Sequence, residues 1–142
     1  MDISKLNDDL TKIVELRNMV SESGLENNLM KKTESELRKS ESQFLKQYGI
    51  YLEEVLKDVH DEICPDDNVL SPIDYLAKKY IDTGNKRDGR KVYEVENDQG
   101  VTVGVDDYPN KDTKLVILPN PVRIMLIVDR RDREELWRAN LN

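Results

Sequence analysis

The sequence predicts an α+β protein, with an N-terminal helical arm followed by a small four-stranded antiparallel sheet and a C-terminal helix. The first observation is that residues 1–64 contain no proline, while all five prolines come later. Proline fixes φ and removes a backbone donor, so a proline-free stretch can be helical almost throughout. The second observation is that the apolar period changes from 3.6 to 2 residues at about Lys91. We therefore expect a helical arm over 1–64 and a small α+β head over 65–142.

The first segment has the stripe of an amphipathic helix. Its apolar residues recur at intervals of three and four, at Ile3, Leu6, Leu10, Ile13, Leu16 and Val20. This spacing places them on one helical face. Gly24 suits the left-handed position that ends many helices, so we expect this helix to stop within residues 21–24.

Residues 25–48 carry a narrow apolar seam, which passes through Met30, Leu37, Phe44 and Tyr48. A seam this narrow is typical of a coiled-coil edge. A fully helical segment of this length would reach about 36 Å, longer than a small head needs. The seam either closes a helical hairpin within the chain or binds a partner helix, and a four-helix dimer would combine both.

The segment from Ile50 to Ile63 also has one apolar face. Glycine inside a helix costs only about 1 kcal/mol, so we favour a continuous or slightly kinked helix through Gly49, although two helices stay open. Pro65 ends it, because the residue before a proline avoids the α region. Ser71 followed by Pro72 predicts an N-cap and a short helix over 72–81.

Alternating residues predict strands at 91–96 and 101–106, joined through 97–100 as a β-hairpin with one buried and one solvated face.

Two nearly continuous apolar runs predict further strands at 114–118 and 122–128, with both faces covered. Asp129 is suited to cap a final helix over 130–140, which would present Leu136 and Trp137 to the sheet.

Composition restricts the partners and the location. The net charge is −7 and the pI is about 4.8, so we do not expect nucleic acid as a partner. The single cysteine, Cys64, excludes an intramolecular disulfide and fits a reducing compartment. No apolar run approaches the ~18 residues of a membrane span, and the N-terminus lacks a signal-peptide pattern. We expect a cytoplasmic protein without a membrane partner.

Tests for catalytic and metal motifs fail. His60 and Cys64 are four residues apart on a helix, but the sequence has no second His or Cys to complete a zinc site. The acids that follow Glu94 lack the glycine and glutamate of an EF-hand loop. The segment Glu94-Val95-Glu96 lacks the lysine expected of a metal-dependent nuclease. We therefore expect no catalytic residue, no metal and no cofactor.

Two arginine clusters are candidate contacts for an acidic or phosphorylated partner, because arginine binds oxyanions through two parallel hydrogen bonds. Aspartates lie between these arginines, which favours intramolecular pairing or plain solvation. The candidate contacts are Arg87, Arg90, Arg130, Arg131 and Arg133.

The narrow seam points to a non-enzymatic module for protein–protein interaction or assembly: an adaptor, an assembly subunit or a small chaperone-like regulator. We expect a homo-oligomer or a protein partner. The partner-binding candidates are Leu6, Leu10, Ile13, Met30, Leu37, Phe44 and Tyr48. An alternative is an acidic inhibitor that mimics nucleic acid in the basic site of an enzyme. A third alternative, a small metal-dependent hydrolase, has less support.

Overall fold

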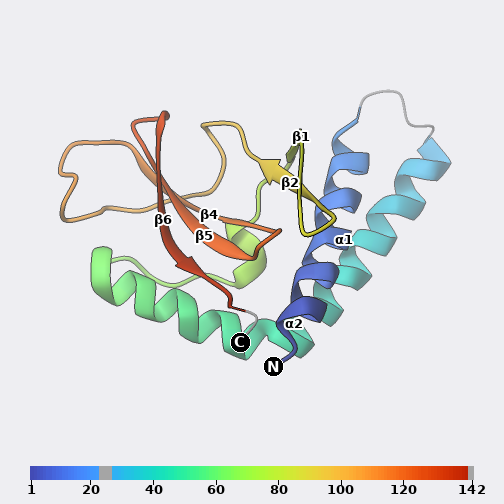
Figure 1. Cartoon of the computed structure of the whole chain (residues 1–142), viewed down its shortest axis with the longest axis horizontal. Coiled ribbons are helices and arrows are strands. Elements are labelled where there is room, and N and C mark those ends of the chain that lie inside the picture. The colour runs from blue at the N-terminus through green and yellow to red at the C-terminus, as the bar shows by residue number, and fades with distance from the viewer. Residues whose placement is uncertain (23–26, 141–142) are drawn as a thin grey trace.

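The computed structural model describes residues 1–22 and 27–140, and within them the chain folds into two helices, one short 3-10 turn and two sheets. The elements are α1 (Ile3–Ser21), α2 (Asn27–Ile63), η1 (Pro72–Tyr75), β1 (Ile81–Arg87), β2 (Arg90–Glu94), β3 (Val101–Thr102), β4 (Thr113–Leu118), β5 (Arg123–Val128) and β6 (Asp132–Arg138). Strands β1 and β2 form a two-stranded ribbon, and the others form an antiparallel sheet in the order β3-β4-β5-β6 (Figure 1). The predicted α+β class and its four-stranded antiparallel sheet are confirmed.

Both long helices form where the apolar stripes predict them. The Asp2 side chain caps α1 by accepting a hydrogen bond from the Lys5 backbone N–H at 3.0 Å. Helix α2 continues through Gly49, so residues 27–63 form one helix. It changes direction in its middle, where the first half lies beside α1 and the second half runs along the sheet (Figure 1). The expected role of Gly24 lies outside the described residues.

Strands β4 and β5 are buried on both faces, as their continuous apolar runs predict. One face packs on the second half of α2, through Leu115, Ile117, Ile124 and Leu126 against Leu52, Leu56 and Val59. The opposite face packs through Val116, Leu118 and Ile127 on Val14, Tyr80 and Tyr93. The first of these clusters also contains Leu6 and Leu10, so the arm and the head share one core.

The predicted hairpin through 97–100 is wrong. Strand β2 pairs with β1, and β3 pairs with β4. The reason is the dipeptide Asp88-Gly89, which adopts φ values of 53° and 78° and closes a tight hairpin turn between β1 and β2. The predicted strand at 101–106 shortens to two residues.

The predicted short helix over 72–81 is also wrong beyond Tyr75. Its expected C-terminal half instead bonds to side chains of α1. The Tyr80 backbone N–H donates to the Asn18 side-chain oxygen at 2.7 Å, and the Asn18 amide donates back to the Tyr80 carbonyl at 3.1 Å. These bonds replace the helical ones, and the chain enters β1 at Ile81.

The predicted C-terminal helix over 130–140 is a strand, β6. Asp129 and Arg130 have φ values of 53° and 58° and turn the chain back along β5, where Trp137 lies opposite Ile124. Pairing with β6 satisfies the backbone N–H and C=O groups at the open edge of β5. This gain outweighs the local preference for a helix. Leu136 and Trp137 still pack against the core, as predicted, but from a strand.

Neither helix of the described residues has an apolar stretch that could span a lipid bilayer.

Candidate functional site

The seven seam residues divide into a buried group and a half-buried pair. Leu6, Leu10, Ile13, Phe44 and Tyr48 belong to the core of this chain. The Tyr48 hydroxyl donates to the Asp9 carboxylate at 2.6 Å, and burial together with this bond raises the pKa of Tyr48. Met30 and Leu37 are only half-buried. Another molecule can therefore reach the seam at the end of the arm that carries Met30 and Leu37.

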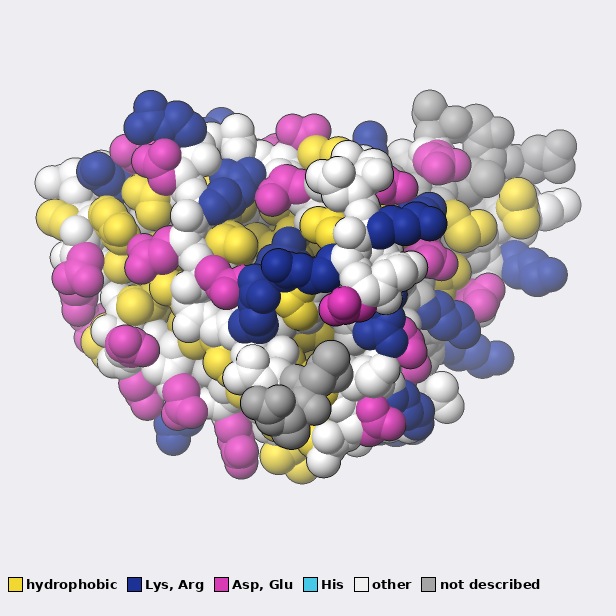
Figure 2. Space-filling view, viewed as in Figure 1, with side chains coloured by type: hydrophobic (Ala, Val, Ile, Leu, Met, Phe, Trp, Pro, Cys, Tyr) yellow, Lys and Arg dark blue, Asp and Glu magenta, His cyan; other side chains and the backbone are white. Residues whose placement is uncertain are grey.

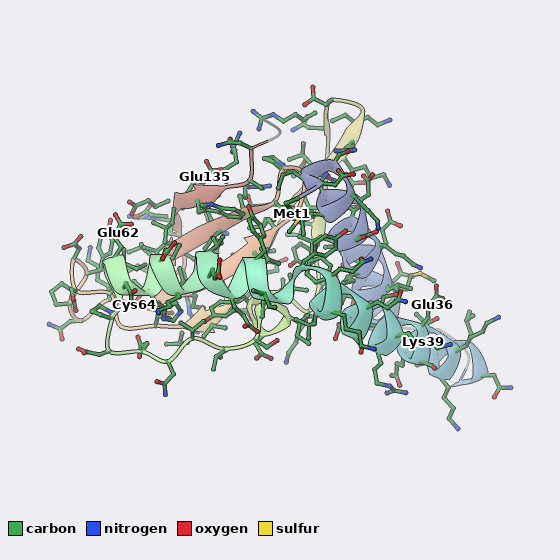
Figure 3. All side chains as sticks on the ribbon, turned by 90° about the horizontal axis from the view of Figure 1, so that it is seen from below. Met1, Glu36, Lys39, Glu62, Cys64 and Glu135 are labelled. Atoms are coloured by element: carbon green, nitrogen blue, oxygen red, sulfur yellow. The ribbon has the colours of Figure 1, made fainter. Side chains whose placement is uncertain are left out.

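An apolar groove lies at this end of the arm, and its volume is about 330 Å³. It is lined by Arg17, Val20, Ser21, Leu37, Glu41 and Lys78. Figure 3 shows that the part of α2 that carries Glu36 and Lys39 extends past the sheet. We refer to this groove, together with Met19 near the end of α1 and Leu29 near the start of α2, as the arm-end surface. Met19 is 41% exposed and Leu29 is 46% exposed, which is high for side chains of their size.

A fixed ion pair forms one wall of the groove. The Arg17 Nη2 atom lies 3.0 Å from the Glu41 carboxylate, and both side chains are mostly buried. The same guanidinium donates to the carbonyls of Ile73, Leu76 and Ala77 at 3.1 to 3.4 Å. Arg17 therefore links both helices to η1 and to the segment that follows it. Chemically, the groove can accept apolar side chains between polar walls.

The second arginine cluster is paired within the head. Arg130 lies 3.2 Å from Asp112, and Arg131 lies 3.2 Å from Asp132. Arg133 lies 3.4 Å from the Glu94 carboxylate. These intramolecular ion pairs match the interpretation that the interspersed acids favoured.

The first arginine cluster is only partly paired. Arg90 lies 3.2 Å from the Asp8 carboxylate and donates to the Ser4 hydroxyl at 2.9 Å. Arg87 is exposed and has no carboxylate within 4 Å among the described residues. The structure does not join the two clusters, because they lie near opposite ends of β6, and a seven-residue strand spans about 20 Å.

His60 is a buried hydrogen-bonding residue. Its Nε2 atom lies 2.9 Å from the Tyr75 hydroxyl, and its Nδ1 atom lies 3.2 Å from the Asp67 carbonyl. The Leu70 N–H donates to the same hydroxyl at 3.0 Å. The tautomer that satisfies every atom has the proton on Nδ1, so that Tyr75 donates to Nε2.

Cys64, four residues after His60, is almost completely buried. Burial, followed by the charges of Asp67 and Asp106, raises the pKa of its thiol from 9.0 to about 11. A buried, protonated thiol is a poor nucleophile and a poor metal ligand. Within residues 1–22 and 27–140, no three His, Cys, Asp or Glu side chains are arranged to hold a metal ion.

Sequence reasoning missed three buried polar residues. Asn7 and Asn120 bond to each other, and Arg123 donates to the carbonyls of Pro119, Pro121 and Tyr93 at 2.8 to 3.2 Å. A signal was present for two of them. Asn7 occupies a position on the apolar stripe of α1, and Arg123 interrupts the apolar run over residues 122–128. A polar residue at a core position requires hydrogen-bonding partners. Such a residue therefore marks a place where hydrogen bonds connect separate segments.

Comparisons of the chain with protein-family models, with curated proteins and with solved structures found no match. Two features of the described residues are candidate sites: the arm-end surface, and Arg87, which has no ion-pair partner among those residues.

Proposed function

We propose that the protein is a non-enzymatic interaction module that associates with a second copy of itself through the arm-end surface. The observation that carries this proposal is the apolar groove of about 330 Å³ at the end of the arm, which also exposes Met19 and Leu29. Fully burying a large apolar side chain contributes about 1.5–3 kcal/mol, so covering these partly exposed side chains in both copies contributes to association.

The charges around the groove favour a second copy as the occupant. The neighbouring helical surface carries both signs, as in the ion pair between Lys12 and Glu36 at 3.7 Å. Its cations are Lys12, Lys31, Lys32 and Lys39, and its acids are Glu22, Glu34 and Glu36. Two identical surfaces with mixed charge can meet about a two-fold axis, so that each acid faces a base.

Light scattering behind a sizing column, over a range of protein concentrations, tests this proposal. We expect a mass of twice the 16.5 kDa of one chain at high concentration. The double variant Met19→Glu with Leu29→Glu should be monomeric, with an unchanged circular dichroism spectrum. Ile50→Glu is the matched control, because Ile50 is also on α2 and is 78% exposed, but lies away from the arm-end surface. It should remain dimeric.

A monomeric wild-type chain at every concentration refutes self-association. Equal loss of association in the Ile50→Glu variant would show that exposed apolar side chains in general, and not the arm-end surface, cause the association.

One observation favours the acidic inhibitor as a second candidate. Residues 49–63 of α2 carry five acids and one lysine, and Asp106 lies beside the end of α2, where its N–H donates to the Ile63 carbonyl at 3.1 Å. Acidic side chains gather at the left end of the molecule in Figure 2. This end would bind a basic site. Binding to a basic nucleic-acid enzyme should then be lost in high salt and in the double variant Asp61→Lys with Glu62→Lys, and binding that is insensitive to salt would contradict it.

A further inference from the structure

Three cross-strand pairs of like charge occur among the described residues, although the net charge of the chain is −7. Like charges directly opposite each other destabilise a sheet. The pairs are Lys86 with Lys91, Arg87 with Arg90, and Arg123 with Arg138. Two pairs belong to the β1–β2 ribbon, and the third belongs to the larger sheet.

The pairs lie in one region of the molecule, around the turn of the β1–β2 ribbon, the start of β5 and the end of β6. Burial lowers the pKa of the Arg123 guanidinium, and the charges of Arg138 and Arg87 lower it further, while Glu94 and Glu135 oppose them. Arg87 and Arg138 are thus both near Arg123. Figure 2 shows Lys and Arg side chains gathered around the middle of the visible face.

A small cleft opens in this region, between the start of α1, the turn of the β1–β2 ribbon and the turn between β4 and β5. Arg87 and Arg90 stand on its rim, and its apolar lining includes Ile3, Val122 and Ala139. Its volume is about 60 Å³. A water-sized group needs about 10–15 Å³ on this measure, so the cleft holds a group of about four or five heavy atoms. That is the size of a single oxyanion.

The two rim arginines differ in what already holds them. Asp8 and Ser4 fix the guanidinium of Arg90, with contacts of 3.2 and 2.9 Å. Arg87 has no ion-pair partner among the described residues. It therefore presents a full set of donors to the cleft, beside a second cation that is already positioned.

The buried cation below the rim adds to the positive potential. Arg123 is 7% exposed and bonds only to carbonyl oxygens within the described residues, so no carboxylate within 4 Å neutralises it. Charges in a poorly hydrated interior are weakly screened, and their field extends to a nearby cleft.

We propose that this cleft is a binding site for a phosphate-type oxyanion, which Arg87 holds through two parallel hydrogen bonds while Arg90 supplies the second positive charge. The planar guanidinium matches the geometry of phosphate oxygens. Two adjacent cations fit the double charge of a phosphate monoester better than the single charge of a carboxylate. This site is separate from the arm-end surface, so it does not depend on the proposed function.

Asp88 also lines the cleft, at the turn of the ribbon, and its carboxylate repels an anion. The affinity for free phosphate should therefore be modest, with a Kd of about 1 mM.

Titration of the full chain with inorganic phosphate, followed by amide NMR at constant ionic strength, tests the site. We expect saturable shifts at Gly89 and Asn120, which flank the cleft, and no saturable shifts with acetate. Arg87→Gln should weaken binding about tenfold, because it removes both the positive charge and the guanidinium that donates two parallel hydrogen bonds. Arg131→Gln is the matched control, because Arg131 is an exposed arginine in another hairpin turn. It should bind phosphate as the wild type does.

Arg87→Lys separates charge from geometry. It should bind more weakly than wild type, because lysine keeps the charge but lacks the planar guanidinium. Shifts that do not saturate, equal shifts with acetate, or wild-type affinity in Arg87→Gln would overturn the proposal, and wild-type affinity in Arg87→Lys would overturn the bidentate contact. A phosphoserine peptide that binds at least tenfold more tightly than phosphate would identify a protein-borne ligand, and equal affinity would identify a free phosphate compound. Both outcomes support the site.

Discussion

Replacing Asn120 by glycine removes the side chain that fastens the turn between β4 and β5 to helix α1. The Asn120 side-chain oxygen accepts from the Asn7 amide, and its backbone N–H donates to the Asn7 side-chain oxygen at 2.7 Å. The Asn120 amide also donates to the Lys91 carbonyl at 2.7 Å. Asn120 has a φ of 62°, which glycine adopts without strain, so the substitution isolates the side-chain bonds.

The structure sets the size of the effect. Asn120→Gly leaves the buried Asn7 amide and the partly exposed Lys91 carbonyl without these partners. A buried orphan costs about 1–3 kcal/mol, and access to water lowers the cost of the carbonyl to about 1 kcal/mol. We expect a loss of about 2–4 kcal/mol in the free energy of unfolding, and a similar loss for Asn7→Ala. Because the two residues share bonds, the double variant should lose about 1–2 kcal/mol less than the sum of the single losses.

Urea unfolding, followed by the fluorescence of the single tryptophan, Trp137, measures these losses. Asn110→Gly is the matched control, because Asn110 has a φ of 65° but is exposed and makes no side-chain hydrogen bond to the described residues. It should change stability by less than about 0.5 kcal/mol. Losses that add within about 0.5 kcal/mol, or a loss below about 1 kcal/mol for Asn120→Gly, would refute the reasoning.

Three further predictions concern other buried or strained groups. Tyr75→Phe removes the hydroxyl between His60 and Leu70, and should lower the free energy of unfolding by about 1–3 kcal/mol in urea unfolding; an unchanged midpoint would contradict this. The native Cys64 thiol should stay protonated between pH 9 and about 11, where the unfolded chain ionises, so stability should fall as pH rises through this range. The free energy of unfolding of Cys64→Ala should depend less steeply on pH over this range, and a slope identical to that of the wild type would count against the raised pKa. Arg130→Gly should raise the melting temperature, because relief of the positive φ is worth about 1–2 kcal/mol and the exposed ion pair at most about 1; a lower melting temperature would reverse the balance.

The helices and the central strands could be predicted from the sequence because their signals are local and repeated. The apolar stripe of residues 3–20 and the continuous runs that became β4 and β5 each bury one side or both sides of an element, and burial dominates folding energy. The same patterns indicated correctly that the central strands are covered on both faces.

The ribbon was missed because its first strand, β1, buries nothing. All seven of its residues are exposed, so it has no apolar period. The dipeptide Asp88-Gly89 was the available signal, because it favours the turn that the structure contains. The C-terminal strand was missed for another reason: its partner is an edge of the sheet, and tertiary pairing overrides local preference.

The candidate site depended on features that no spacing rule reveals. The exposure of Met19 and Leu29, and the lack of a partner for Arg87, both result from how distant elements pack. The apolar seam is visible in the sequence. Its division into a part buried against α1 and an accessible end is visible only in the structure.

Residues 64–80 contain only one short turn and connect the arm to the head, so by secondary structure alone they resemble a cleavable linker. Arg17 and Asn18 nevertheless bind the carbonyls and amides of this segment, and the Tyr80 hydroxyl joins the Ala77 N–H to the Ile117 carbonyl, at 2.9 and 2.7 Å. Proteases cut most readily at exposed loop tips, and the Asp88-Gly89 turn of the exposed ribbon is such a tip, whereas the connection is held by these bonds. Limited digestion should thus nick the ribbon before it severs arm from head, and the two parts should stay together as one body.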